Sequence, residues 1–93
     1  MNNMKPTSNR YRIDQFIITR SALRRLHPRD ILASLRRHER TDWGDCPADV
    51  VRANEDSLKD GGRLRSAYCD RRGLEFWIIT GVDRWTTVML PEY

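Results

Sequence analysis

The chain has 93 residues, of which 39% are hydrophobic and 32% charged, and its formal net charge is +4. A chain of this length holds one domain, and its apolar content is too high for a disordered protein. The longest apolar run, Phe76–Ile79, is far shorter than the roughly 18 residues that cross a bilayer, and residues 1–10 lack the apolar stretch of a signal peptide. We therefore expect a cytoplasmic protein with no membrane partner.

The positive charge is concentrated in the first part of the chain. Residues 1–40 contain ten basic and three acidic side chains, whereas residues 41–93 contain seven basic and ten acidic ones. Most of the basic residues are arginines, whose guanidinium groups make planar, bidentate contacts with phosphate and carboxylate. The basic part therefore suits nucleic acid or an acidic protein surface, although a GC-rich genome would produce the same composition without a binding role.

The first elements in chain order are a tail, a strand and two helices. Residues 1–10 have the composition of a flexible tail, and Tyr11–Thr19 is rich in β-branched and aromatic residues, which predicts a short strand. Thr19 or Ser21 can cap a short helix, and Pro28 suits the first turn of a second one. The inner face of this second helix is predicted to carry Ile31, Leu32 and Leu35.

A loop and a third helix follow. Thr41–Cys46 is predicted to be a loop that turns at Gly44, and Pro47 is predicted to begin the helix. Asn54 lies on the apolar stripe of this helix. We expect it to be a buried amide that hydrogen-bonds loop backbone, with the Thr41–Asp45 segment as a candidate partner, or else a polar group in a pocket. Gly61 and Gly62 end the helix.

The hydrophobic period then changes from about 3.6 to 2, which predicts strands over Arg63–Cys69, Leu74–Thr80 and Thr86–Leu90. Short turns join them, so neighbouring strands should pair as hairpins with Leu74–Thr80 in the centre. The predicted fold is α+β: a short N-terminal strand, three helices and a three-stranded antiparallel β-meander, in one domain over residues 11–93. The N-terminal strand either joins the sheet edge or does not form, and an open edge would let two copies pair as a homodimer.

Several segments, taken in order, carry a family resemblance: TDWGD (Thr41–Asp45), VRAN (Val51–Asn54), LKDGGRLRSAY (Leu58–Tyr68), FWIIT (Phe76–Thr80) and TTVMLPEY (Thr86–Tyr93). Together they resemble a family of short bacterial proteins that are common on plasmids and integrated elements. Members are called plasmid-related protein or type I restriction endonuclease subunit M. The resemblance covers roughly residues 12–93 and implies a protein of a mobile genetic element.

The methylase name does not agree with the sequence. A methyltransferase needs a doubly wound sheet for its cofactor and an Asn-Pro-Pro-aromatic motif for the target base, and this chain has too few predicted strands and no such motif. We interpret the name as a record of neighbouring restriction genes. In size and lack of enzymatic motifs the chain resembles anti-restriction and anti-CRISPR inhibitors, and this resemblance implies a role against host defence.

The loop after the second predicted helix is the first candidate for partner binding. An exposed Trp43 between Asp42 and Asp45 would anchor a basic partner, since tryptophan is enriched at interaction hot spots. Alternatively, Trp43 packs over the core and Asp45 caps the third helix. Trp85, in the last turn, is expected to be partly exposed and to join an interface.

The second candidate is a basic helical face made of Arg24, Arg25, Arg29, Arg36, Arg37 and Arg40. These arginines would follow a phosphate backbone or contact an acidic protein surface, unless they are ordinary solvated helix residues. We expect no catalytic residue, no cofactor and no metal site.

Two functional hypotheses follow. The first is a non-enzymatic inhibitor from a mobile element that blocks a protein effector of a CRISPR-Cas or restriction system. Because the chain is basic, such an inhibitor would not act by mimicking DNA. The second is an accessory protein that binds nucleic acid without sequence specificity, since no recognition helix with base-reading side chains is evident.

Overall fold

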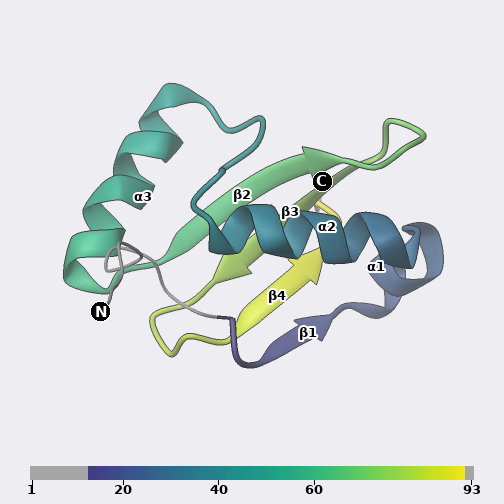
Figure 1. Ribbon diagram of the computed structural model, residues 1–93, viewed down its shortest axis with the longest axis horizontal. Coiled ribbons are helices and arrows are strands. Elements are labelled where there is room, and N and C mark those ends of the chain that lie inside the picture. The colour runs from purple at the N-terminus through teal and green to yellow at the C-terminus, as the bar shows by residue number, and fades with distance from the viewer. Residues whose placement is uncertain (1–12, 92–93) are drawn as a thin grey trace, which may run out of the picture.

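The structure, a computed structural model, describes residues 13–91, so the predicted tail over residues 1–10 lies outside the described part. The protein is a small α+β domain with three helices and a four-stranded mixed sheet (Figure 1). The elements are β1 (Phe16–Ile18), α1 (Arg20–Arg25), α2 (Pro28–Glu39), α3 (Ala48–Asp60), β2 (Leu64–Cys69), β3 (Glu75–Thr80) and β4 (Thr86–Met89).

The helices begin and end largely at the predicted residues. The Oγ1 of Thr19 accepts a hydrogen bond from the Ala22 amide at 3.3 Å and caps α1. Pro28 occupies the first turn of α2, as predicted, and Gly61 ends α3 with a φ of +82°. The prediction for the start of α3 was wrong, because Pro47 precedes the helix and no side chain caps it. Asp45 therefore does not cap α3, since it lies two residues before the N-cap position, and its amide donates instead to the Ala67 carbonyl of β2 at 2.8 Å.

The sheet differs from the predicted three-stranded meander. Strands β2, β3 and β4 pair antiparallel in sequence order, but β1 pairs with β4 in parallel, and the strand order is β1-β4-β3-β2. Only Phe16–Ile18 of the predicted Tyr11–Thr19 strand forms a strand among the described residues. The parallel pair joins Ile17 to Thr87, residues almost at opposite ends of the chain, and local sequence patterns carry no signal for such a contact.

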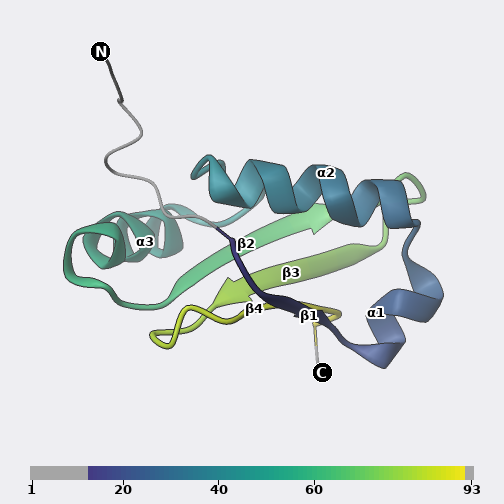
Figure 2. The same cartoon turned by 60° about the horizontal axis from the view of Figure 1, so that its bottom comes forward.

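The helices and the sheet form two layers (Figure 2). Helix α2 runs along one face of the sheet, α3 lies beside β2 and α1 lies at the end of the domain. The core between α2 and the sheet consists of Ala22, Leu26, Ile31, Leu35, Tyr68, Phe76, Ile78 and Val88. On the opposite face Trp77 and Ile79 are half-buried, and the Arg65 guanidinium lies 4.7 Å from the centre of the Trp77 ring. None of the helices in residues 13–91 is long and apolar enough to cross a membrane.

Candidate interaction surface

Trp43 lies in the interior and is only 5% exposed. Its ring and the His38 imidazole form a T-shaped pair at a centroid distance of 5.7 Å, and its Nε1 donates to Glu55 of α3 at 3.3 Å. This burial agrees with the packing interpretation and contradicts the prediction of an exposed anchor. The loop folds inward because the Trp43 carbonyl accepts from the Ala67 amide of β2 at 3.1 Å.

Asp42 and Arg37, two predicted partner-binding residues, bind each other. The Nε and Nη2 of Arg37 donate to the two carboxylate oxygens of Asp42 at 2.8 and 3.2 Å. This hydrogen bonding lowers the pKa of the Asp42 carboxyl group below its ordinary value. The Arg37 guanidinium also lies 4.7 Å from the centre of the Tyr68 ring, and the Tyr68 hydroxyl donates to the Asp42 carbonyl at 2.6 Å. These contacts hold the loop against β2, and they leave Arg37 less free for a partner.

A chain of polar side chains runs beneath Trp43. The His38 imidazole contacts the Ser66 hydroxyl through Nδ1 and the Thr80 hydroxyl through Nε2 at 3.0 Å, and Thr80 contacts Thr86 at 2.8 Å. All four side chains are 0% exposed. Burial lowers the pKa of His38 from 6.5 to about 3, so the imidazole is neutral near pH 7. Because neither Ser66 nor His38 is accessible to solvent, this pair stabilises the core and presents no nucleophile at the surface.

Asn54 is a buried amide, as predicted, but its partner is not the predicted loop. Its Nδ2 donates to the Arg65 carbonyl at 2.8 Å, and its Oδ1 accepts from the Arg65 amide at 3.0 Å. The side chain is 2% exposed. The amide thus satisfies both backbone groups that a neighbouring strand would otherwise satisfy at this edge of β2.

We expect Asn54→Ala to lower the free energy of unfolding by about 1–3 kcal/mol, because it leaves the Arg65 amide without a partner and the Arg65 carbonyl with only the Cys46 thiol, 3.4 Å away. Urea unfolding followed by fluorescence measures the change. Arg52→Ala, at an exposed position of the same helix, is the matched control and should remain within about 0.5 kcal/mol of wild type. Equal stabilities for the two variants would contradict the role assigned to Asn54.

Four arginines meet where α1, the start of α2 and the β2–β3 hairpin come together. We call this set the arginine corner: Arg24 and Arg25 at the end of α1, and Arg71 and Arg72 in the hairpin turn. The predicted basic face included the first two and missed the hairpin pair. The consecutive arginines after Asp70 were visible in the sequence, but nothing in their spacing indicated which helix the turn would reach.

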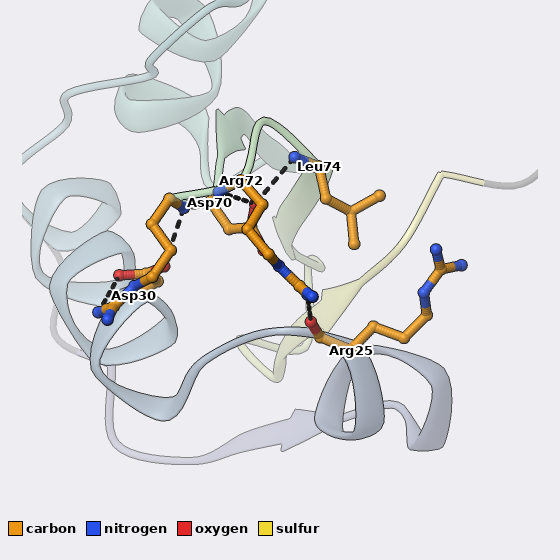
Figure 3. A network of polar contacts seen from close by, with 6 residues as sticks. Arg25, Asp30, Asp70, Arg72 and Leu74 are labelled. Atoms are coloured by element: carbon orange, nitrogen blue, oxygen red, sulfur yellow. Dashed lines mark hydrogen bonds and ion pairs between the residues drawn. The ribbon is translucent and has the colours of Figure 1, made fainter.

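Arg71 connects the hairpin to α2 through a bidentate ion pair. Its Nε and Nη2 donate to the carboxylate of Asp30 at 3.0 and 2.9 Å, and its amide donates to the same group at 3.0 Å (Figure 3). The hydrogen bonds from the Arg71 side chain and amide lower the pKa of Asp30 to about 2. The charge of Arg71 is therefore largely neutralised within the protein, and this pair sets the position of the hairpin.

Arg72 connects the same hairpin to α1. Its Nη2 donates to the Arg25 carbonyl at the end of α1, and it lies 3.6 Å from the carboxylate of Asp70 (Figure 3). The other oxygen of Asp70 accepts from the amides of Arg72 and Leu74 at 2.9 and 2.8 Å, which lowers the pKa of this carboxyl group. Asp70 thus stabilises the turn and only partly balances the charge of Arg72, whose side chain is 69% exposed.

An open hollow of about 520 Å³ lies at the arginine corner. Its walls are the four arginines, and its other lining residues are Leu23, Leu26, His27 and Pro28. Arg24 and Arg25 are exposed, and neither side chain forms an ion pair with any residue in the range 13–91. The hollow therefore combines uncompensated guanidinium groups with apolar surface. Chemically it suits an anionic group that is attached to an apolar body.

The remaining predicted residues lie elsewhere. Arg36 and Arg40 are exposed at the far end of α2, and Arg29 is exposed in its first turn. Trp85, 42% exposed, lies in the β3–β4 turn, which also contains the exposed Val82. The predicted basic face is therefore divided between the two ends of α2, and Trp85 belongs to neither part.

Comparison with protein-family models, curated proteins and solved structures found no match for this chain. Within the described range, no group of three or more His, Cys, Asp or Glu side chains is arranged to hold a metal ion. The function is therefore inferred from the contacts, burial and charge of the described residues.

Proposed function

We propose that the protein is a non-enzymatic binding protein that contacts an acidic surface of a protein partner through the arginine corner. The observation that supports this most directly is the mixed lining of the hollow. The exposed Arg24 and Arg25 supply charge, Leu23 and Pro28 supply apolar surface, and the ion pair of Arg71 with Asp30 holds the walls in place. A preorganised site with arginines around an apolar centre is typical of the energetically important part of a protein interface.

The distribution of charge favours a protein over nucleic acid as the partner. Along α2, Arg29 in the first turn and Arg36 in the last turn are separated by about 10 Å, and Arg40 lies about 6 Å beyond Arg36. Leu32, 51% exposed, and Ala33 lie between them on the exposed side. A phosphate backbone is matched best by a continuous basic stripe, because it carries closely and evenly spaced charges. A compact basic site fits a discrete acidic patch instead.

The identity of the partner is proposed from the family resemblance. Segments such as Thr41–Asp45 and Thr86–Tyr93 resemble short proteins of plasmids and integrated elements, whose hosts attack incoming DNA. We propose that the partner is an effector of a CRISPR-Cas or restriction system, and that the bound protein blocks this effector sterically. Such inhibition requires a stable complex and no chemical step by the inhibitor.

Phage plating on hosts that carry a defined restriction or CRISPR-Cas system tests this proposal. The protein should raise the plating efficiency, and its tagged form should retain the effector stoichiometrically. Arg24→Glu/Arg25→Glu should reduce retention at least tenfold, equivalent to about 1.4 kcal/mol. Arg36→Glu/Arg40→Glu makes the same change in net charge at the other end of α2 and should leave retention within about twofold of wild type, a change of only about 0.4 kcal/mol.

Three outcomes would contradict the proposal. One is no rescue of plating by the wild-type protein against any system tested, with no effector retained. Another is an equal loss of retention in both double variants, which would indicate unspecific attraction by net charge. The third is retardation of DNA or RNA at 50 mM salt that declines steeply toward 200 mM, which would identify a nucleic-acid-binding protein.

A further inference from the structure

The side chain of Arg72 crosses the arginine corner from the hairpin to the end of α1. Its Nη2 donates to the Arg25 carbonyl, and Leu74 and Asp30 lie on opposite sides of it (Figure 3). The Asp70 carboxylate, 3.6 Å from the guanidinium, holds it from the side of the hairpin. The Arg72 side chain therefore separates the corner into two parts.

A hollow lies on each side of this side chain. The hollow on the side of Leu74 has a volume of about 370 Å³, and all its other lining residues are arginines. The hollow on the side of α2 is the one of about 520 Å³ described above, and its apolar lining includes Leu23 and Pro28. Arg72 and the two arginines of α1 line both hollows. A ligand that crosses Arg72 can therefore place one group in each hollow.

The charges at the corner leave an excess of two positive charges. The four arginines contribute +4, and the two carboxylates that contact them, Asp30 and Asp70, contribute −2. Arg24 and Arg25 have no ion pair within residues 13–91. A ligand with one carboxylate would balance only half of this excess, whereas a ligand with two carboxylates would balance all of it.

Arg72 has enough hydrogen-bond donors for two anionic groups. A guanidinium group has five N–H donors, and in the described part of the chain one of those of Arg72 forms a hydrogen bond, to the Arg25 carbonyl. The side chain is 69% exposed, so a ligand can reach the remaining donors. Because the group is planar and has N–H groups along its edges, it can contact a carboxylate on each side.

We propose that the arginine corner binds an acidic peptide segment of the partner, with one carboxylate on each side of Arg72. The inference rests on the proposed function and specifies the chemistry of the partner. In an extended segment, residues two apart project to the same side about 7 Å apart, so one residue separates the two acidic ones. An apolar side chain two positions farther along enters the hollow beside Leu23 and Pro28. The motif is acidic-x-acidic-x-apolar, in either chain direction.

Fluorescence anisotropy of short labelled peptides with the purified protein tests this motif. The probe is the capped peptide Leu-Ser-Asp-Ser-Asp-Ser-Leu, which contains the motif in both chain directions. Leu-Ser-Asp-Asp-Ser-Ser-Leu has the same composition and charge, but its carboxylates are adjacent and project to opposite sides. At an ionic strength of about 0.15 M, which screens long-range attraction, the probe should bind at least fivefold more tightly than this control peptide. Replacement of either Asp of the probe by Asn should also weaken binding at least fivefold.

Variants of the protein test the role of Arg72. Arg72→Lys keeps the positive charge but removes the planar group that contacts two carboxylates, so the preference for the probe over the control peptide should fall below twofold. Arg36→Lys, at the other end of α2, is the matched control and should keep the full preference. Circular dichroism of each variant verifies that it is folded.

Equal affinity for the two peptides of equal composition would overturn the proposal, as would a preference that Arg72→Lys leaves unchanged. Absence of binding of the probe up to about 1 mM would overturn it as well. So would tighter binding of a probe in which phosphoserine replaces one Asp and Asn replaces the other, because a single dianion would then be the preferred ligand.

These results are separable from those for the proposed function. Rescue of plating with retention of an effector, together with equal affinity for all peptides, would contradict the motif and leave the proposed function standing. A clear preference for the probe, with no effector retained, would support the motif and contradict the proposed identity of the partner.

Discussion

Gly44→Ala should lower the free energy of unfolding by more than about 3 kcal/mol, because two separate costs combine at this position. Gly44 has a φ of +70°, a conformation that residues with a Cβ adopt only under strain. A Cβ atom here would also lie 2.1 Å from the Ala67 carbonyl oxygen and 2.7 Å from the Tyr68 ring. The carbonyl belongs to a paired strand, so the clash can be relieved only by moving the loop away from β2.

Gly73→Ala is the matched control for this prediction. Gly73 has a similar φ of +87°, but a Cβ atom there would meet nothing within 4 Å. The substitution Gly73→Ala therefore has only the conformational cost, about 1–2 kcal/mol. Urea unfolding of both variants separates the two costs, and the excess for Gly44→Ala measures the close approach of the loop to β2. Equal destabilisation of the two variants would contradict that close approach.

Stability should increase with pH between about 4 and 6.5 because of His38. Burial lowers the pKa of His38 from 6.5 to about 3, so the unfolded chain binds this proton more readily than the folded protein does. The stabilisation is fully present above pH 6.5 and is lost as the pH falls toward 3. The free energy of unfolding changes by up to about 1.4 kcal/mol per pH unit in this range. It should therefore fall by about 2 kcal/mol between pH 6 and pH 4.5.

The measurement is chemical unfolding at several pH values from 7.5 to 4.5. This range lies above the pH at which the paired carboxyl groups of Asp30, Asp42 and Asp70 become protonated, since their pKa values are lowered from 3.8. His38→Gln has no titrating group and should show a flatter profile in the same range. A wild-type profile without a slope, or an equal slope in His38→Gln, would contradict the assignment to His38.

The residues of the candidate site illustrate what sequence reasoning could reach. Arg24 and Arg25 were predicted to bind a partner, and the structure places both at the hollow. Arg71 and Arg72 were missed because their role depends on a turn meeting two helices that precede it by more than forty residues. For Trp43 both interpretations were open, and only the bond between the loop and Ala67 shows why the ring lies inside.

The sequence by itself determined the local elements of this protein: a cap at Thr19 or Ser21, the start of α2 at Pro28, the end of α3 at the Gly61–Gly62 pair and the change from helices to strands near it. Each depends on neighbouring residues, whose backbone preferences and hydrophobic period act over a few positions. Only the tertiary structure decided the parallel pairing of β1 with β4 and the gathering of arginines at one corner. Both require residues that are distant in the sequence to meet, and such contacts depend on how whole elements pack rather than on any local pattern.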